Sequence, residues 1–406
     1  MVQTPSQPPM ASLFWTQRQD IGPSARYGHA LAWDEAAGQV LLVGGDGLGV
    51  LHVDTWRWNG ETWTQVENIG PPARAGHAIA SDSARARVVL FGGTSGGGPL
   101  GDTWEWDGEA WTQVENTGPT ARSGHALAYD SARSRVVLFG GEDADGLRDD
   151  TWEWDGDEWT QVADTGPSAR SGHAMCFEAP AARTVLFGGS TGADTWTWDG
   201  ARWTEINDVG PEPRQGTALV FGGVPVLFGG IDPGASTPLA FGGTWQLDGA
   251  DWTKRQDIGP AARHGHAMAY DGSRGRVVLH GGMGAPAGTA TADDLFSDTW
   301  ELPTGGPGPG PGPTPGAVPA LISFTIVPDV VSVGESYTLE VGLDQPTSAP
   351  TTIAISVDGS PAGEILVEAG EAMVAAVVSG WPPDPGTYVF AASLGETTLT
   401  ASLTVT

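Results

Sequence analysis

The sequence predicts an all-β protein in which a six-bladed β-propeller precedes a β-sandwich. Three observations support this fold class. A phrase close to P-x-A-R-x-G-H-A recurs six times, 44 to 49 residues apart, and short runs rich in Val, Trp and Thr follow each copy. Such a period is typical of propeller repeats. A Pro/Gly segment then precedes about 90 residues in which apolar and polar side chains alternate, a pattern that indicates the strands of a sandwich.

The six repeats, numbered one to six in chain order, each contain four candidate strands. The first resembles GHALAYD, the second VVLFGG, the third DTWEW and the fourth WTQV. Asn-Gly or Asp-Gly pairs separate the third and fourth runs of repeats one to five, and both residues of such a pair tolerate the positive φ of a type I′ hairpin turn. Four antiparallel strands per repeat predict one propeller blade per repeat. The repeat arginines are Arg26, Arg74, Arg122, Arg170, Arg214 and Arg263.

The sixth repeat is incomplete, because it ends after its third run at 298–302 and no WT run follows. A spare copy lies before repeat one, where residues 15–23 nearly repeat residues 252–260. We therefore expect Trp15-Thr16-Gln17 to form the outer strand of blade six. This pairing closes the ring and removes the open edges of an unclosed array.

Glycine pairs end the second run of every repeat, and a tryptophan follows in each third run. In repeats one to four a second tryptophan follows two residues later. These features resemble the kelch repeat, and the resemblance covers residues 13–303. It implies a kelch-type propeller in which ligands contact the loops between the second and third strands and the loops between blades.

The two tryptophans of the third run, for example Trp104 and Trp106, lie two residues apart. Residues i and i+2 of a strand share a face, so both are expected to point into the space between blades. Leu247 and Leu302 replace the second tryptophan in repeats five and six, an exchange typical of packing rather than of a ligand platform. We therefore interpret these tryptophans as scaffold.

Outside the repeats, the sequence predicts three further segments. Residues 1–12 are expected to be a flexible N-terminus, and the Pro/Gly run at 304–317 to be a semi-rigid linker. Residues 318–406 contain seven alternating runs with turn signals between them. They resemble the cysteine-free immunoglobulin-like modules of bacterial surface and secreted proteins, which implies an immunoglobulin-like β-sandwich.

The chain is strongly acidic, with 49 acidic residues against 19 basic ones and a formal charge of −30. This charge argues against nucleic acid or an anionic membrane as partner. A single cysteine excludes an internal disulfide, and no apolar run is long enough to cross a membrane. The first 15 residues lack the pattern of a signal peptide. A secreted or cell-surface monomer is nevertheless expected, because of the linker and the surface-type second module.

Histidine occupies one position of the first run in five repeats, and aspartate precedes the first tryptophan in the same five. Repeat five has Thr217 and Gly243 instead. First and third strands run in the same direction, which places both positions near one face. We expect each histidine to bond the aspartate of its own blade, which would fix its tautomer; a metal ring is the alternative. The expected pairs are His29–Asp54, His77–Asp102, His125–Asp150, His173–Asp194 and His266–Asp298.

The loops between the second and third strands differ in length, and the two longest, 231–242 and 283–297, belong to adjacent blades. Long loops on a rigid scaffold are where propellers place recognition. Two alternatives remain. In one, the long loops only cover the ring without binding a ligand, and in the other, the repeat arginines pair with nearby acids instead of contacting a ligand. The candidate ligand-binding residues are Arg214, Arg263, His264, Leu239, Phe241, Leu295 and Phe296.

The loop of repeat three places carboxylates at Asp143, Asp145 and Asp149 around a glycine. This arrangement resembles a calcium loop, but a bidentate glutamate at the right distance is missing. The three aspartates are therefore only weak candidates for a metal site, and no cofactor is predicted.

The function predicted from these features is non-enzymatic binding of a protein or glycan partner through the loops of one face. One alternative is a kelch-type enzyme acting on sugars, similar to the sialic acid mutarotases, and another is a purely structural surface repeat protein. A deep pocket lined by Arg214, Arg263 and His264 would indicate the enzyme. A flat or convex face bearing Leu239 and Phe296 would indicate binding.

Overall fold

A computed structural model of the chain describes residues 15–18, 21–67, 70–115, 117–207, 210–235, 239–256, 259–284, 290–304, 321–327, 330–332, 336–343, 351–358, 360–367, 373–379, 385–394 and 397–405. The predicted N-terminal segment 1–12 and all but one residue of the linker 304–317 lie outside these residues. Within them the fold is all-β, as predicted, apart from two short 3₁₀ helices, η1 (Ala179–Ala181) and η2 (Ala292–Asp294). None of the described helices is long and apolar enough to cross a membrane. The chain divides into two compact units, residues 13–310 and residues 1–12 with 311–406.

Six four-stranded antiparallel sheets make up the first unit. Sheets one and two contain β2 (Ala30–Asp34), β3 (Gln39–Val43), β4 (Thr55–Trp58), β5 (Trp63–Glu67), then β6 (Ala78–Asp82), β7 (Arg87–Phe91), β10 (Thr103–Trp106), β11 (Trp111–Glu115). Sheets three and four contain β12 (Ala126–Asp130), β13 (Arg135–Phe139), β16 (Thr151–Trp154), β17 (Trp159–Ala163), then β18 (Ala174–Glu178), β19 (Arg183–Phe187), β20 (Thr195–Trp198), β21 (Trp203–Asn207). Sheets five and six contain β22 (Ala218–Phe221), β23 (Pro225–Phe228), β24 (Thr244–Asp248), β25 (Asp251–Gln256), then β26 (Ala267–Asp271), β27 (Arg276–His280), β28 (Thr299–Pro303), β1 (Thr16–Gln17). Each sheet therefore corresponds to one sequence repeat.

The outer strand of sheet six comes from the start of the chain. Thr16 of β1 pairs with Glu301 of β28, and Gln17 pairs with Trp300. Two short hairpins, β8 (Thr94–Ser95) with β9 (Gly98–Pro99) and β14 (Glu142–Asp143) with β15 (Gly146–Leu147), extend from sheets two and three. No pattern in the sequence indicates these hairpins, because each strand has only two residues.

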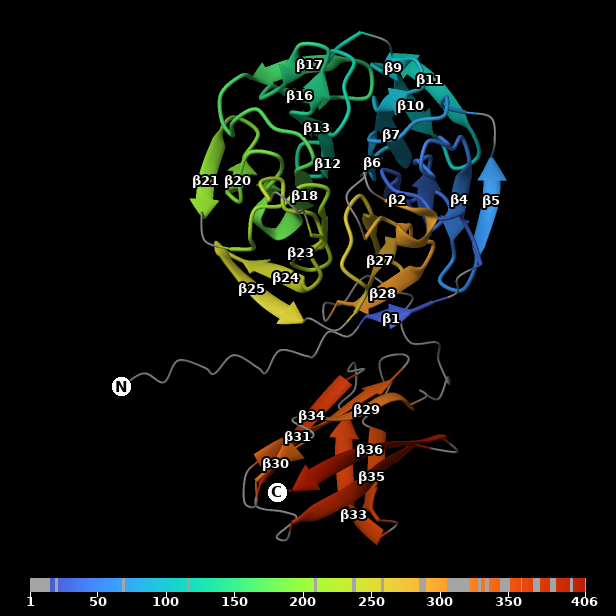
Figure 1. The fold of residues 1–406 in the computed structure, drawn as a ribbon, viewed down its shortest axis with the longest axis vertical. Coiled ribbons are helices and arrows are strands. Elements are labelled where there is room, and N and C mark those ends of the chain that lie inside the picture. Colours follow the sequence, from blue (N-terminus) through green and yellow to red (C-terminus); the bar gives the residue numbers. More distant parts are fainter. Residues whose placement is uncertain are drawn as a thin grey trace. The chain divides into compact units, whose positions relative to one another are not determined.

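The sheets surround a common axis, with the first strand of each innermost (Figure 1). Six glycines that precede these first strands form a ring of backbone hydrogen bonds. Each N–H donates to the glycine carbonyl of the preceding repeat, and repeat one donates to repeat six at 2.7 Å. The glycines have φ between 61° and 67°, a left-handed conformation that other residues rarely adopt. They are Gly28, Gly76, Gly124, Gly172, Gly216 and Gly265.

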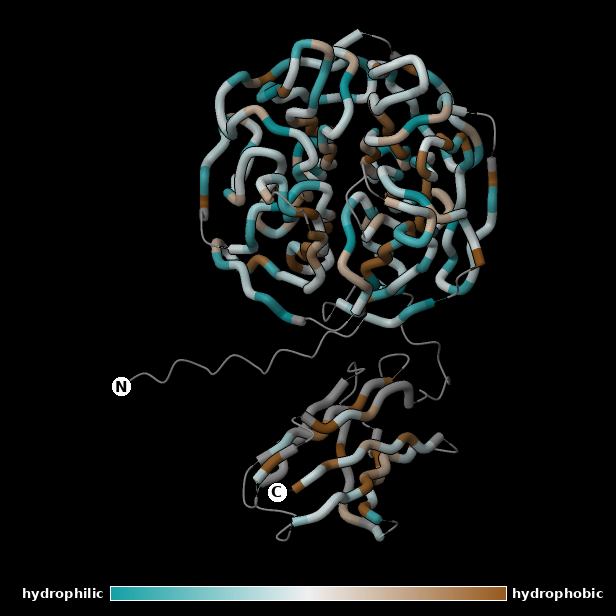
Figure 2. The backbone as a smooth tube through the Cα atoms, in the orientation of Figure 1, coloured by the Kyte–Doolittle hydropathy of each residue, from teal (hydrophilic) through white to brown (hydrophobic). Residues whose placement is uncertain are grey.

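Hydrophobic side chains fill the space between neighbouring sheets. Six separate clusters lie there, one for each pair of neighbours, including sheets six and one. Alternate residues of a second strand serve opposite neighbours: Leu41 packs toward sheet two and Leu42 toward sheet six, and both are fully buried. Hydrophobic segments accordingly gather in the inner part of the ring (Figure 2). Trp104 and Trp106 pack into one such cluster, as the scaffold interpretation predicts.

The tryptophan of each fourth strand also makes a hydrogen bond to the preceding sheet. Its indole N–H donates to the threonine that begins the third strand of that sheet, at 2.7 to 3.0 Å. The series runs around all six sheets, because Trp63 of sheet one donates to Thr299 of sheet six and Trp15 donates to Thr244 of sheet five. The recurring DTW and WT phrases are therefore the two halves of one contact.

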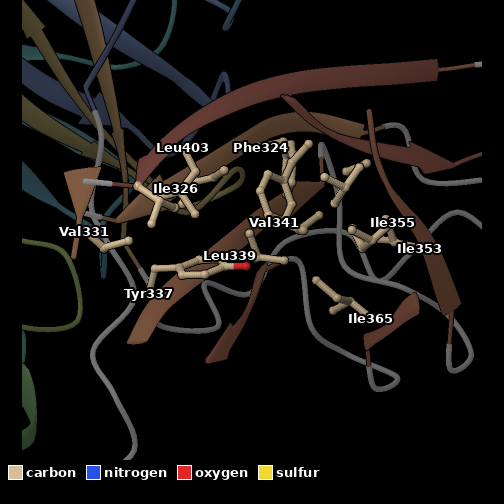
Figure 3. Close-up of a cluster of buried hydrophobic side chains, with 14 of the residues drawn as sticks. Phe324, Ile326, Val331, Tyr337, Leu339, Val341, Ile353, Ile355, Ile365 and Leu403 are labelled. Atoms are coloured by element: carbon tan, nitrogen blue, oxygen red, sulfur yellow. The ribbon is translucent and has the colours of Figure 1, made fainter. Parts of the chain in front are cut away.

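The second unit consists of two sheets around one core (Figure 3). One sheet contains β29 (Leu321–Val327), β31 (Ser336–Leu343) and β34 (Met373–Ser379). The other contains β30 (Val330–Val331), β36 (Thr397–Val405), β35 (Gly386–Leu394), β32 (Thr351–Val357) and β33 (Ser360–Val367). All seven runs expected from the sequence are strands, and β30 is an addition. Val341, Ile353 and Leu403 are fully buried in the shared core.

Candidate functional site

One face of the first unit carries the loops between second and third strands and is called here the loop face. The repeat arginine and the glycine pair of each repeat meet there, together with the repeat aspartate in five of the six repeats. In repeat one, Arg26 Nη1 donates to Gly44 O at 2.8 Å and to Asp54 Oδ1 at 2.6 Å. Glycine is required at this junction, because a Cβ on Gly44 would lie 2.8 Å from the carbonyl oxygen of Arg74.

The repeat arginines form buried bidentate pairs with the repeat aspartates in five repeats. Nη1 bonds Oδ1 at 2.5 to 2.8 Å and Nη2 bonds Oδ2 at 2.8 to 2.9 Å. The arginine side chains are 0–1 % exposed, whereas the aspartates keep 14–23 % exposure. Burial alone would raise the pKa of these aspartates, but the hydrogen bonds and charge of the arginines outweigh it and lower the pKa.

The predicted histidine–aspartate pairs are wrong. The aspartates bond the arginines and the first tryptophan of the third strand, whose indole N–H donates to Oδ2 at 2.6 to 2.8 Å. No described hydrogen bond joins a histidine to its aspartate in His29–Asp54, His77–Asp102, His125–Asp150, His173–Asp194 or His266–Asp298. The planar guanidinium fork matches both carboxylate oxygens, which an imidazole cannot do.

The histidines instead face the neighbouring repeat. His29 Nε2 lies 3.0 Å from the carbonyl oxygen of His280, and His125 Nε2 lies 3.1 Å from that of Phe91. Burial lowers the pKa of His77, His125 and His173 to about 3, so these imidazoles are neutral at physiological pH. His29 and His125 thus link neighbouring sheets through backbone carbonyls, and His173 packs edge-on against Phe139, whereas no hydrogen-bond partner is described for the ring nitrogens of His77 and His173. Among the described residues, no group of three or more His, Cys, Asp or Glu side chains is placed to hold a metal ion.

Repeat five differs from the others at this junction. Gly243 stands where the other repeats have aspartate, yet Arg214 remains and is 1 % exposed. Its Nε donates to Glu212 O and its Nη1 to Gly229 O, both at 3.0 Å. Its Nη2 donates to Glu212 Oε2 at 2.7 Å. Burial lowers the pKa of Arg214 to about 10, although the charge of Glu212 opposes this effect.

The aromatic residues of the two long loops are anchors. Phe241 stacks on Arg214, with the guanidinium carbon 4.3 Å from the ring centroid, and Phe296 stacks on Arg263 at 4.0 Å. The Phe241 N–H donates to Gly230 O, and its carbonyl accepts from the Arg263 N–H. Both phenylalanines are therefore half-buried and fix the ends of their loops.

The other predicted ligand-binding residues separate into exposed and covered ones. Leu239 is 73 % exposed, the most exposed apolar side chain among the described loops between second and third strands. Leu295 is half-buried and forms a β-bridge with Met283, which also bridges the half-buried His264. Arg263 is fully buried against Asp298. Of the seven candidates, the structure thus presents Leu239 most fully to a partner.

The three aspartates of the repeat-three loop are engaged in different ways. Asp143 Oδ2 accepts hydrogen bonds from Arg148 Nε at 2.5 Å and from Thr120 Oγ1 at 2.6 Å. Asp145 lies 3.1 Å from Arg148 Nη2, and Asp149 is exposed. Burial opposes ionisation of Asp143, but these hydrogen bonds lower its pKa to about 2. The arginine thus occupies the position that a cation would need.

Two cavities lie along the axis of the ring. A volume of about 110 Å³ is lined by the six ring glycines, five histidines and Thr217. A larger volume of about 600 Å³ follows the first strands, where Leu31, Leu127 and Leu219 line it, toward the hairpins on the opposite face. Arg214, Arg263 and His264 line neither cavity, so these two cavities lack the arrangement expected of the sugar-active enzyme.

Comparison with known proteins agrees with this geometry. The model of the KLHDC2/KLHL20/DRC7 Kelch-repeats domain matches residues 10–189 and 108–282, together more than half of the chain. The chain belongs to the Kelch-repeat family. The kelch resemblance inferred from the glycine pairs and tryptophans is therefore confirmed, and the first unit of this Kelch-repeat protein is a propeller-like all-β fold.

Two solved structures resemble the chain at low sequence identity. One is a Bacteroides thetaiotaomicron protein of unknown function, 10 % identical, covering 71 % of this chain and 76 % of its own, with a TM-score of 0.45. Another is the CARDB domain of a Pyrococcus furiosus protein in complex with di-metal ions, 21 % identical, covering 22 % of this chain and 94 % of its own, with a TM-score of 0.18. No curated protein matches the chain.

The structure bears out the alternative that the repeat arginines pair with nearby acids, although the sequence did not identify which acid. Aspartate and histidine are absent together from repeat five, which suggested that they bond each other. Arg26 and Asp54, Arg74 and Asp102, and Arg122 and Asp150 are each 28 residues apart. The separation is 24 residues in repeat four and 35 in repeat six, and the histidine and aspartate of one repeat are spaced just as regularly, so spacing alone did not identify the partner.

Proposed function

We propose that this Kelch-repeat protein is a non-enzymatic binding protein, a closed six-bladed propeller that recognises a protein partner through its loop face. Kelch-repeat domains generally mediate protein interactions. Six sheets, the ring of glycine hydrogen bonds and the pairing of β1 with β28 support the blade number and the closure. Closure leaves the loops, rather than open sheet edges, as the surface available to a partner.

The observation that carries this proposal is the exposure of Leu239 next to an anchored segment. Ala240, the residue after it, bridges Ile231, which is 5 % exposed and also bridges Gln215. The next residue, Phe241, is stacked on the buried Arg214. Leu239 is 73 % exposed, so its large apolar side chain can bury its surface against a partner.

The proposal is tested by capture experiments with two substitutions of equal chemistry. Leu239→Asp places a charge on the loop face, and Val162→Asp places the same charge on an outer strand at a position that is 38 % exposed. Proteins that bind the unsubstituted chain are identified from native extract by mass spectrometry. We expect Leu239→Asp to abolish capture and Val162→Asp to leave it unchanged. Equal capture by both variants would contradict recognition at Leu239, and retention only on a glycan array would contradict a protein partner.

For the second unit we propose an immunoglobulin-like sandwich and a secreted or cell-surface location. Two sheets around one core and the alternating runs of 318–406 support the first proposal. The Pro/Gly run at 304–317 supports a linker between two domains, 13–303 and 318–406. Fractionation of the native cells tests the location, which would be wrong if the protein were found in the cytosol.

A further inference from the structure

Three hydrogen-bond donors converge on one carboxylate in five of the six repeats. In repeat three, Arg122 Nη1 bonds Asp150 Oδ1 at 2.6 Å and Arg122 Nη2 bonds Oδ2 at 2.9 Å. The indole N–H of Trp152 donates to the same Oδ2 at 2.8 Å. The aspartate lies at the loop face and is 17 % exposed, so this carboxylate position reaches solvent.

Repeat five keeps the donors and lacks the carboxylate. Gly243 replaces the aspartate, while Arg214 and Trp245 are retained. The third strand keeps its register: Trp245 pairs with Leu227, as Trp152 pairs with Leu138 in repeat three. Trp245 has no hydrogen-bond partner among the described residues, although the equivalent indole bonds aspartate in the other five repeats.

The guanidinium of Arg214 is held in the same way as that of Arg122. In both, Nε donates to the carbonyl two residues earlier, at 3.0 Å, and Nη1 donates to the first carbonyl of the glycine pair, at 2.9 Å in repeat three and 3.0 Å in repeat five. These two anchors fix the plane and direction of the fork. The edge that holds Asp150 in repeat three therefore points to the equivalent position in repeat five.

Glu212 does not take the place of the missing aspartate. It occupies the position of Thr120, whose Oγ1 accepts from Arg122 Nη2 at 2.8 Å in addition to the bond to Asp150. Glu212 Oε2 likewise accepts one Nη2 proton of Arg214. Each Nη carries two protons, so one Nη1 proton and one Nη2 proton of Arg214 have no acceptor among the described residues.

We propose that Arg214 and Trp245 bind a carboxylate of the protein partner, an aspartate or glutamate side chain, in the position that the repeat aspartate fills elsewhere. Charge-assisted bidentate bonds to a buried guanidinium are strong and directional. Leu239 is 73 % exposed and lies two residues before Phe241, which stacks on Arg214, so we expect the acidic residue of the partner to have an apolar residue near it. This inference rests on the proposed function and names the chemistry that the loop face recognises.

The test uses a small probe and the full chain. The probe is 3-(4-fluorophenyl)propionate, and its carboxamide serves as the uncharged control; binding is followed by ¹⁹F NMR. We expect saturable binding of the carboxylate and binding about tenfold weaker for the amide, a difference of about 1.4 kcal/mol. Arg214→Lys removes the fork but keeps the charge and should weaken carboxylate binding about tenfold, whereas Arg122→Lys, whose site holds Asp150, should not.

Trp245→Phe keeps the test valid if Arg214→Lys does not fold, because it removes one donor at a half-buried position. Its matched control is Trp152→Phe. Substitution of Gly243 by aspartate is not suitable, because its φ of 90° strains any side chain. Absence of saturable probe binding, equal binding of the amide, or no effect of either repeat-five variant would overturn the inference.

The probe experiment and the capture experiment can refute the carboxylate site and the proposed function separately. Loss of partner capture by Leu239→Asp without probe binding leaves the proposed function standing and overturns the carboxylate site. Probe binding together with unchanged partner capture by Arg214→Lys overturns the assignment to a protein side chain and indicates a free carboxylate ligand. Weaker probe binding and weaker partner capture in the same variant support the proposal.

Discussion

The indole N–H of Trp15 donates a 2.7 Å hydrogen bond to Thr244 Oγ1, joining the first described residue of the chain to the fifth sheet. The same contact joins every other pair of neighbouring sheets, for example Trp159 to Thr103. Trp15 is 7 % exposed and contacts the ring of Phe228 edge-on. Trp15, which is 229 residues from Thr244 in sequence, thus completes the series of contacts that the tryptophans of the five later WT runs make.

Removing the equivalent threonine hydroxyl between two other sheets should show how much this hydrogen bond contributes to stability. Thr103→Val leaves the buried Trp159 N–H without its acceptor, so the free energy of unfolding should fall by about 1–3 kcal/mol. Thr112→Val, at an exposed position of β11, is the control and should change it little. Urea denaturation followed by tryptophan fluorescence measures both. Equal effects of the two substitutions would show that the bond does not contribute.

Deletion of residues 1–19 should open sheet six. It removes the pairing of β1 with β28 and the buried Trp15, so we expect a loss of about 3–5 kcal/mol in the stability of the first unit. The exposed edge of β28 should also promote self-association. Calorimetry and light scattering measure these two effects. A truncated protein that stays monomeric with an unchanged melting temperature would contradict this role of β1.

Loss of one repeat aspartate should leave a charged arginine buried and unpaired. Asp150→Ala removes the bidentate partner of Arg122, which is 1 % exposed, and should lower the free energy of unfolding by about 3 kcal/mol. Asp145→Ala is the matched control, because Asp145 is 84 % exposed and its ion pair with Arg148 is at the surface. Equal stability of the two variants in urea would show that the buried pair makes no net contribution.

The buried histidines should make the first unit sensitive to mild acid. Burial lowers the pKa of four histidines to about 3 in the folded protein, so they stay neutral at mildly acidic pH; they are His77, His125, His173 and His280. In the unfolded chain the same side chains become protonated below about pH 6.5. The unfolded state therefore binds more protons between these values, and stability falls as the pH is lowered from 6.5. Each histidine should contribute about 1.4 kcal/mol per pH unit.

His125→Asn removes one of these groups and should reduce the slope of stability against pH by about 1.4 kcal/mol per unit between pH 6 and 4. Denaturation curves at a series of pH values measure the slope. Above pH 7 the slopes of the two proteins should coincide, which serves as the internal control. An unchanged slope at acidic pH would mean that His125 is protonated in the folded state.

Much of the fold followed from the sequence, because strand runs and turn residues recur with little change. The incomplete sixth repeat and the spare run at 15–23 correctly indicated that β1 pairs with β28. The alternation of 318–406 indicated seven of the eight strands there, and the two-residue β30 is too short to leave a pattern. These features depend on local chemistry, which a single sequence contains.

The contacts of the loop face could not be obtained in the same way. Histidine, arginine and aspartate all lie near this face, and sequence spacing does not decide which two bond each other. The structure shows instead that Arg26 bonds Asp54 and that His29 bonds a backbone carbonyl of the preceding sheet. Phe241 and Phe296 resembled ligand contacts because they are aromatic residues in long loops, but they stack on buried arginines.

Recognition through the loop face is tested most directly by photo-crosslinking in the native cells. A photoreactive amino acid replaces Leu239 in one variant and Val162, on the outer strand β17, in another. We predict that position 239 forms a crosslink to a discrete protein, that position 162 does not, and that Arg214→Lys reduces the crosslink. Crosslinks of equal yield at both positions, or none at position 239, would contradict recognition of a protein partner by this face.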